Sequence, residues 1–324
     1  MFTKGSPGVV HLQSTQRITT DKPVAVLGAG TIGLSWAALF AAHGFNVRIC
    51  DPSEKATADV TAFVQRERDR LAPVFGLEQT IGTVEVFKTA QLAVTGAQFV
   101  QENSPEVLSV KHELYRSIAS SLDPDCIVAS STSSIPPSEL QAGMPFAERI
   151  VVGHPFNPPH IMPLVEVVAG RDTSPETVAI AMAFYADLHR KPIQLLREAP
   201  GHLANRLQAA LWREALHAVQ SGLATAEDVD TAMMYGPGPR WALLGPHMTF
   251  HLAGGDEGYG HFIDHLGPAF ERMWNDLGSA SFDEKLVDQL LEGVRPRVAG
   301  KTYDELVDSR NASLLQMLKL IEGK

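Results

Sequence analysis

The chain of 324 residues has little cysteine, few aromatic residues and a deficit of positive charge. Its two cysteines, Cys50 and Cys126, cannot build the disulfide framework of a small secreted domain, and both fall in apolar runs that favour buried, reduced thiols. The formal net charge of -10 argues against a nucleic-acid-binding surface. No apolar run reaches the roughly 20 residues of a membrane-spanning helix, so we expect no membrane partner.

The N-terminal segment also lacks the pattern of a secretion signal. Residues 1–20 are polar and irregular, without the charged start and apolar centre of a secretion signal, so we expect a loose arm on a cytoplasmic protein. The sequence shows no internal repeat and no low-complexity segment. The length suggests two domains with ample chain for a large core.

A glycine-rich turn follows the first apolar run of the ordered chain. Residues 23–27 predict a strand, Gly28-Ala29-Gly30-Thr31-Ile32-Gly33 predicts the turn, and residues 34–43 predict a helix. In this pattern Gly28 permits a tight turn, Gly30 lets the backbone approach a pyrophosphate, and Gly33 allows close helix–strand packing. Together with the N-terminus of the helix, the turn predicts a dinucleotide site that includes Thr31 and Ile32.

An acidic residue indicates which dinucleotide binds. Asp51 follows a second apolar run at residues 45–50, about twenty residues beyond the turn, where a carboxylate accepts a hydrogen bond from a ribose 2′-hydroxyl. A carboxylate there repels a 2′-phosphate, so the predicted cofactor is NAD rather than NADP. Arg48 and Lys55 flank this position and could soften the preference, although alternation along the strand turns Arg48 away.

Alternating strand and helix patterns continue to about residue 195. Further strands are expected at 84–88, 99–101, 126–129, 150–152, 164–168 and 192–195, and helices at 55–71, 105–121 and 175–188. This order predicts an α/β Rossmann-type, doubly wound sheet whose ligand crevice lies beyond the C-terminal ends of the strands. From Pro200 onward only helical runs occur, which predicts a second, all-α domain. We expect an NAD-binding domain at 21–197 and a helical substrate and dimerisation domain at 198–324.

One histidine and one glutamate carry the predicted chemistry. His154 opens the run Pro-Phe-Asn-Pro after an expected strand, and Glu166 lies in the next apolar strand between two valines. A carboxylate buried there needs a partner, and His154 is the natural one. A neutral imidazole fixed by a carboxylate can accept the proton of an alcohol while hydride leaves the same carbon, so the pair predicts NAD-dependent oxidation of a secondary alcohol.

Three ordered segments carry a resemblance to a known family. Ser130-Ser131-Thr132-Ser133-Ser134, the run from His154 through Glu166, and residues 200–207 resemble the signature segments of the 3-hydroxyacyl-CoA dehydrogenase family. The resemblance implies a Rossmann domain, a helical dimerisation domain, and oxidation of L-3-hydroxy substrates with NAD. It implies that Ser133 hydrogen-bonds the substrate oxygen, that His154 is the base with Glu166 as its partner, and that Asn205 is a polar group near both.

The same resemblance places further side chains near the nicotinamide half of the cofactor. They are Glu106, Lys111, Ser133 and Asn157, with Glu102 as a further candidate in the loop after its strand. Several have structural alternatives: Ser133 could cap a following helix, Asn157 could be a turn residue, and Asn205 could tie the two domains together. His247 and His251 have helical spacing, but no carboxylate completes a ligand set, so we expect no metal site and leave their role open.

The substrate is predicted less sharply. Acyl-CoA enzymes of the family carry a lysine-rich helix after the second strand, whereas here Arg66, Arg68 and Arg70 alternate with acidic residues. Residues 235–242 and 249–255 instead resemble the branch that acts on free hydroxy acids, which contains L-carnitine dehydrogenase, L-gulonate 3-dehydrogenase and lambda-crystallin. Candidate substrate contacts are Arg240 for a carboxylate, and Trp241 and Phe250 as aromatic faces for a cation, although core packing is a commoner role for aromatic rings.

We therefore predict an NAD-dependent dehydrogenase of a small free L-3-hydroxy acid, carnitine-like or gulonate-like, that acts as a homodimer. One alternative is an L-3-hydroxyacyl-CoA dehydrogenase, such as one for 3-hydroxybutyryl-CoA. A remote alternative is a non-catalytic NAD-binding structural protein, which the intact His, Glu, Ser and Asn set disfavours. The exact substrate, the physiological direction and any assembly beyond a dimer are left open by the sequence.

Overall fold

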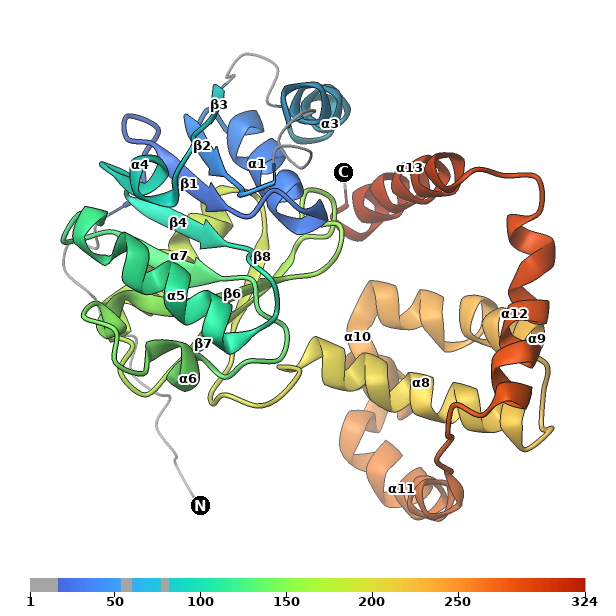
Figure 1. Ribbon diagram of the computed structural model, residues 1–324. Helices are drawn as coiled ribbons and strands as arrows, with labels where there is room; N and C mark the ends of the chain where they lie inside the picture. The colour runs from blue at the N-terminus through green and yellow to red at the C-terminus, as the bar shows by residue number, and fades with distance from the viewer. Residues whose placement is uncertain (1–16, 54–59, 77–81, 324) are drawn as a thin grey trace, which may run out of the picture. The chain divides into compact units, whose positions relative to one another are not determined.

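The protein is described by a computed structural model at residues 17–53, 60–76 and 82–323 (Figure 1). Its internal contacts divide the chain after Leu203 into two compact units, an α/β unit and a helical unit. The short segment 198–203, assigned from the sequence to the helical domain, hydrogen-bonds to the α/β unit through His202 and Leu203. The irregular arm expected at 1–20 lies mostly outside the described residues.

The first unit is built on one eight-stranded sheet with the order β3-β2-β1-β4-β5-β6-β7-β8. The neighbouring strands pair in parallel, except that β6 and β7 pair antiparallel. The strands are β1 Val24–Leu27, β2 Val47–Cys50, β3 Val84–Val86, β4 Phe99–Glu102, β5 Ile127–Ser130, β6 Ile150–Pro155, β7 Leu164–Ala169 and β8 Lys191–Gln194. The predicted α/β doubly wound sheet is confirmed.

Helices cover both faces of this sheet (Figure 1). They are α1 Thr31–Ala42, α3 Val60–Phe75, α4 Ala90–Val94, α5 Leu108–Ile118, α6 Pro137–Gln141 and α7 Pro175–Asp187. The short helices α4 and α6 were not expected, because five residues are too few to display a helical period. The expected helix at 55–71 begins among residues that are not described, and its described part runs to Phe75.

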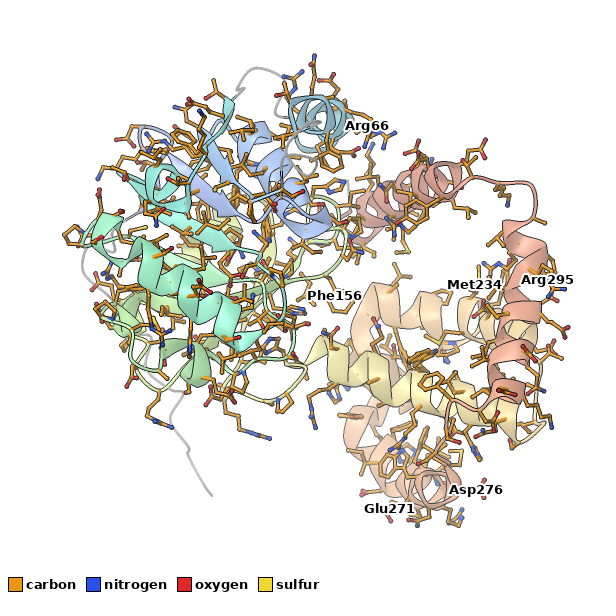
Figure 2. All side chains as sticks on the ribbon, in the orientation of Figure 1. Arg66, Phe156, Met234, Glu271, Asp276 and Arg295 are labelled. Carbon is orange, nitrogen blue, oxygen red and sulfur yellow. The ribbon has the colours of Figure 1, made fainter. Side chains whose placement is uncertain are left out.

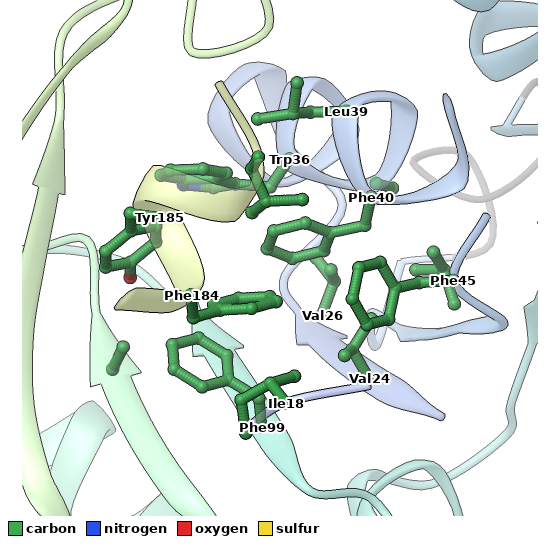
Figure 3. Close-up of a cluster of buried hydrophobic side chains, with 14 of the residues drawn as sticks. Ile18, Val24, Val26, Trp36, Leu39, Phe40, Phe45, Phe99, Phe184 and Tyr185 are labelled. Atoms are coloured by element: carbon green, nitrogen blue, oxygen red, sulfur yellow. The ribbon is translucent and has the colours of Figure 1, made fainter. Parts of the chain in front are cut away.

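The core consists of two apolar layers, one on each face of the sheet. Along β1, Val24 and Val26 belong to one layer, which contains the rings of Trp36, Phe40 and Phe184 (Figure 3). The alternate residues Ala25 and Leu27 belong to the other layer, with Tyr115 of α5. Both faces of each central strand are therefore buried, which is why these strands read as continuous apolar runs in the sequence.

The strand register brings the predicted ligand-binding residues to one edge of the sheet. Leu27, the last residue of β1, lies opposite Cys50 of β2 and Glu102 of β4, and Glu102 lies opposite Ser130 of β5. The glycine turn, Asp51, the loop after β4 and the serine run therefore all leave the sheet at the same edge, where doubly wound folds bind ligands.

The second unit is helical throughout its described residues. Its helices are α8 Ala204–Gln220, α9 Ala226–Tyr235, α10 Pro237–Ala253, α11 Gly258–Asp276, α12 Glu284–Val298 and α13 Tyr303–Ile321. The predicted all-α second domain is confirmed, and Thr225, Asp283 and Thr302 each cap a helix by accepting a backbone N–H bond. None of the described helices is long and apolar enough to cross a membrane.

Candidate active site

The glycine turn between β1 and α1 is tightly packed at Gly28 and Gly33 and open at Gly30. A Cβ atom at Gly33 would lie 1.8 Å from the carbonyl oxygen of Gly28, and Gly28 itself has a left-handed φ of +95°. A Cβ at Gly30 would meet nothing within 4 Å. Gly33 is therefore required for helix–strand packing, whereas Gly30 presents bare backbone at the N-terminus of α1, as a dinucleotide-binding turn requires.

Asp51 holds this turn from the end of β2. Its Oδ2 accepts a 2.7 Å hydrogen bond from the backbone N–H of Ala29, and its Oδ1 accepts one of 2.8 Å from Ser53. Thr31 is exposed and Ile32 half-buried in the first turn of α1. Of the two flanking cations, Arg48 donates to the carbonyl of Thr95 and stacks 5.3 Å from the centre of the Phe87 ring, and Lys55 lies outside the described residues.

A buried ionic network fixes the loop after β4. Glu102 and Lys111 are almost completely buried, and Lys111 Nζ lies 2.9 Å from Oε1 and 3.1 Å from Oε2 of Glu102. Glu102 also accepts hydrogen bonds from the hydroxyls of Ser104, Ser130 and Tyr115. Burial and the adjacent Glu102 carboxylate raise the pKa of Tyr115 well above its usual value, so its phenol remains a donor. The network joins β4, α5 and the end of β5 into one rigid support.

Glu106 organises the serine run. Its Oε1 accepts hydrogen bonds from the Thr132 hydroxyl at 2.6 Å and from the backbone N–H groups of Ser133 and Ser134 at 2.9 and 2.8 Å. Partial burial raises the pKa of Glu106, but these hydrogen bonds and the charge of Lys111 outweigh that effect and leave the pKa below its ordinary value. An ionised Glu106 therefore sets the backbone course that positions the Ser133 hydroxyl.

His154 and Glu166 meet because β6 and β7 are antiparallel. The two residues lie directly opposite in the register, which brings their side chains to the same face of the sheet. His154 Nδ1 lies 2.8 Å from Glu166 Oε2, and the other carboxylate oxygen accepts a 2.8 Å hydrogen bond from the backbone N–H of Leu203. Glu166 is completely buried and His154 is 5% exposed. The expected contact between them is present.

The remaining predicted residues are distributed over both units. Asn157 is exposed on the turn after β6, before a cis bond to Pro158. In the helical unit, Asn205 is half-buried in the first turn of α8, Arg240 is exposed on α10, Trp241 beside it is half-buried, and Phe250 stacks 4.8 Å from Phe262.

The two histidines with helical spacing both contact one tyrosine. His247 Nδ1 lies 3.0 Å from the hydroxyl of Tyr259, and His251 Nδ1 accepts a 3.1 Å hydrogen bond from the Tyr259 backbone N–H. These contacts join α10 to α11, which is a structural role.

One residue of the site was not singled out in the sequence. His202 is buried, its ring centroid lies 5.0 Å from that of His154, and its Nε2 lies 2.9 Å from the carbonyl oxygen of Thr132. It is part of the third signature segment, but a single histidine after a glycine carries no pattern that predicts a tertiary contact. The only available signal was its position beside Leu203 and Asn205 in that segment.

Comparison with known proteins shows the family of the chain. The sequence profile of the 3-hydroxyacyl-CoA dehydrogenase NAD-binding domain matches residues 23–199, and that of the C-terminal domain of the same family matches residues 201–293. An L-carnitine dehydrogenase of Streptomyces coelicolor is 41% identical over 91% of this chain and 93% of its own length. One of a Pseudomonas species is 38% identical over 94% of this chain and 95% of its own.

Solved structures show the same architecture. The NAD-dependent 5-formyl-3-hydroxy-2-methylpyridine 4-carboxylic acid 5-dehydrogenase superposes with a TM-score of 0.81 at 31% identity, covering 94% of this chain and 99% of that one. The 3-hydroxyacyl-CoA dehydrogenase of Archaeoglobus fulgidus gives a TM-score of 0.64 at 25% identity, covering 93% and 99%. With both domain profiles matched in order along it, the chain belongs to the 3-hydroxyacyl-CoA dehydrogenase family and is an NAD-dependent oxidoreductase that acts on CH–OH groups.

Proposed function

We propose that the protein oxidises the 3-hydroxyl group of a small, free L-3-hydroxy acid to the 3-oxo acid, with His154 as the base. The observation that carries this proposal is the buried 2.8 Å contact between His154 Nδ1 and Glu166 Oε2. Because a carboxylate only accepts, Nδ1 carries the proton, and the lone pair of the neutral ring lies on Nε2. Nε2 is then the atom that accepts the proton of the substrate hydroxyl.

Glu166 is also proposed to stabilise the protonated form of His154. The imidazolium of His154 places a positive charge in a buried site, and the carboxylate at hydrogen-bond distance offsets it. The hydrogen bond from Leu203 N–H keeps the other oxygen of Glu166 in place, so the ring cannot rotate freely away from the substrate. The Ser133 hydroxyl, on the loop set by Glu106, is the proposed second contact with the substrate oxygen.

The residues of the glycine turn fit the cofactor. When bound, NAD supplies the hydride acceptor. Gly28, Gly30, Thr31, Ile32 and Gly33 would hold the pyrophosphate, with the open face at Gly30 as the supporting observation, and Asp51 would bind the ribose. Glu102, Glu106, Lys111 and Asn157 belong to the proposed nicotinamide side; the burial of Glu102 and Lys111 gives them a positioning role there.

Two observations favour a free acid over a CoA thioester. The three arginines of α3 each contact a carboxylate of the same helix: Arg66 and Arg70 lie 2.8 and 3.3 Å from Glu67, and Arg68 lies 2.6 Å from Asp69 (Figure 2 shows Arg66). Cations already paired in this way make a weak binding site for the phosphates of CoA. The L-carnitine dehydrogenases that cover nearly the whole chain are also named for a free hydroxy acid.

Residues of α10 are the proposed substrate contacts in the helical unit. The exposed guanidinium of Arg240 is suited to a two-pronged bond with the carboxylate of the acid. The ring of Trp241 and the ring of Phe250, which stacks on Phe262, are the faces proposed to contact a quaternary ammonium group. Replacing Arg240 by Met should raise the KM for a free acid by about tenfold to a hundredfold while changing kcat little. An unchanged KM would remove Arg240 from the site.

The substrate class is tested by following NADH formation at alkaline pH. L-carnitine, L-gulonate, L-3-hydroxybutyrate and L-3-hydroxybutyryl-CoA are compared in parallel under the same conditions. Turnover of a free acid with none of the thioester supports the proposal and identifies the substrate. A preference for the thioester would contradict it and would show that the paired arginines of α3 still bind CoA. Absence of any turnover together with intact NAD binding would favour a structural role.

The base is tested with His154→Ala. We expect a fall in kcat of about 10²- to 10⁴-fold, because general-base catalysis contributes that much, with little change in NAD affinity measured by calorimetry. His265→Ala, an exposed histidine of α11, is the matched control and should keep full activity. Near-normal turnover of His154→Ala would refute the assignment.

The helical unit supports a homodimer as the working assembly. Its described core is small, with Leu216, Val219 and Leu286 as the buried centre. Nearby, a groove of about 790 Å³ includes Leu211 and Trp212, and large apolar side chains line it at the surface. Such an apolar surface is rarely left uncovered on a monomer, and a second copy of the chain is the proposed partner.

The assembly is tested by measuring the mass in solution by light scattering. The native chain should be a dimer, and Leu211→Asp should shift it toward the monomer because it buries a charge in the interface. Leu196→Asp, on a fully exposed loop residue of the α/β unit, should leave the dimer intact. A monomeric native chain would rule the assembly out.

A further inference from the structure

A buried glutamine of β4 reaches across the sheet to the strand that carries His154. Gln101 is completely buried, and β5 lies between β4 and β6 in the sheet. The paired part of β5 ends at Ser130. Just beyond it, Gln101 Nε2 lies 2.8 Å from Ser131 Oγ and 3.3 Å from the carbonyl oxygen of Gly153. One amide group therefore binds both the start of the serine run and the residue before His154.

The contacts of Gln101 fix the orientation of its amide. The Gly153 carbonyl can only accept, so the NH2 group faces it and Oε1 faces the hydroxyl of Tyr185, 2.7 Å away. Burial raises the pKa of Tyr185 above its ordinary value, so the phenol keeps its proton and donates to Oε1. A Cβ atom at Gly153 would lie 2.0 Å from the Tyr185 hydroxyl, so this arrangement also requires glycine before His154.

The Ser131 hydroxyl is held by three hydrogen bonds. Its Oγ accepts from Gln101 Nε2 and, at 3.1 Å, from the indole N–H of Trp36. It donates its own proton to Asn103 Oδ1 at 2.7 Å. Trp36 and Tyr185 belong to the apolar layer on one face of the sheet (Figure 3). Because each polar hydrogen of Gln101, Ser131 and Tyr185 has an acceptor, this buried network is fully satisfied and therefore rigid.

We propose that Gln101 is a positioning residue that fixes the spacing between His154 and the serine run. This inference rests on the proposed function, in which His154 and Ser133 contact the same substrate oxygen. Two groups that act on one atom must keep their separation, and a displacement of about 1 Å can cost about a hundredfold in rate. Gln101 sets that separation because it binds Gly153, next to His154, and Ser131, two residues before Ser133.

A second buried glutamine provides a matched control at the other end of β6. Gln141 of α6 is 1% exposed, and its Nε2 lies 3.4 Å from the carbonyl oxygen of Ile150, the first residue of β6, and 2.7 Å from Thr173 Oγ1. Its Oε1 accepts a 3.1 Å hydrogen bond from the backbone N–H of Asp172. Replacing either glutamine by Met removes a buried amide that binds β6, but only Gln101 binds next to His154.

The experiment measures kcat, KM and NAD affinity, with kcat expressed per NAD-binding site from the calorimetric stoichiometry. Both Met variants should melt at lower temperature, because each leaves buried polar groups unpaired. In Gln101→Met we expect kcat to fall by about 10- to 100-fold, with KM and NAD affinity within about threefold of native, whereas Gln141→Met should keep kcat within about threefold. Ser131→Ala, at a half-buried position, removes one of the two contacts of Gln101 and should lower kcat by about tenfold. Equal losses of kcat in the two Met variants, or a native kcat in Gln101→Met or Ser131→Ala, would overturn the inference.

Hydrogen exchange followed by mass spectrometry tests the same contacts without substrate. In Gln101→Met, the peptides that contain residues 131–134 and 153–156 should exchange faster than in the native protein, because the bonds that hold both segments are lost. In Gln141→Met those peptides should keep their native rates. Unchanged rates in Gln101→Met would overturn the inference. If the native protein oxidises no hydroxy acid, the proposed function fails, while the exchange rates still decide whether Gln101 holds the two segments.

Discussion

Replacing Glu166 by Gln exchanges one carboxylate oxygen for an amide NH2 group and so tests the contact between Glu166 and His154. The native carboxylate accepts two hydrogen bonds, from His154 Nδ1 and from the backbone N–H of Leu203, both at 2.8 Å. A glutamine has only one oxygen for these two donors. If the oxygen stays on Leu203, the amide N–H group faces His154 and favours the tautomer with the proton on Nε2, which cannot act as a base. If the oxygen turns to His154, two N–H groups oppose each other in the interior.

The expected loss of activity follows from these contacts. A hydrogen bond to a charged group contributes about 1.5–3 kcal/mol, which is about a tenfold to 150-fold effect on the stability of the imidazolium. The wrong tautomer adds to this loss, so we expect kcat for the preferred hydroxy acid to fall by about 10²- to 10⁴-fold. The affinity for NAD should stay within about threefold of the native value, because Glu166 belongs to the sheet rather than to the glycine turn.

The assay is steady-state NADH formation, paired with calorimetric NAD binding and a thermal unfolding scan. Glu176→Gln, an exposed residue in the first turn of α7, makes the same chemical change at the surface and should retain full activity. A value of kcat for Glu166→Gln within threefold of the native one, in a protein that still binds NAD, would refute the reasoning that Glu166 sets the tautomer and offsets the charge of His154.

Three further predictions concern stability and cofactor binding. Gly33→Ala should lower the melting temperature sharply or prevent folding, because the added Cβ would collide with the Gly28 carbonyl. Gly30→Ala should leave the melting temperature nearly unchanged and weaken NAD binding, measured by calorimetry, by about tenfold or more. Equal effects of the two variants would contradict the distinction between packing at Gly33 and ligand approach at Gly30. Burial lowers the pKa of His43 to about 4, so the unfolded chain binds more protons between about pH 6.5 and pH 4. The free energy of unfolding should therefore fall as the pH drops through that window, by at most about 3 kcal/mol from this group, and His43→Gln should lessen the fall in denaturant titrations; an identical pH dependence would exclude His43 as the cause. Burial raises the pKa of Glu67, but its contact with His160 at 3.2 Å and the neighbouring arginines outweigh burial and lower the pKa to about 2. Glu67→Gln should therefore destabilise the protein by roughly 1–3 kcal/mol. An unchanged denaturation midpoint would mean that the contact between Glu67 and His160 does not stabilise the fold.

Much of the fold follows from local patterns in the chain. Short apolar runs predicted the strands of the sheet, and the change to helical runs after Pro200 predicted the all-α second domain. The glycine turn and Asp51 were predictable for the same reason, because their geometry depends on neighbours within one strand–turn–helix–strand unit. The boundaries of β3 and the short helices α4 and α6 were missed, since segments of three to five residues contain too few positions to show a period.

In the candidate site, too, some features follow from the sequence and others depend on tertiary contacts. The sequence by itself determined which residue types are present for the proposed chemistry: a glycine turn proposed to hold phosphates, an acid proposed to bind the ribose, and a histidine with a glutamate in an apolar strand that needs a partner. Only the tertiary structure decided how they meet. The antiparallel pairing of β6 and β7 places His154 opposite Glu166, and the left-handed turn at His202 brings a second imidazole and the Leu203 N–H to the same point. These contacts join residues far apart in the chain, and the free energy that selects them comes from burial and register across the whole sheet, which no local pattern records.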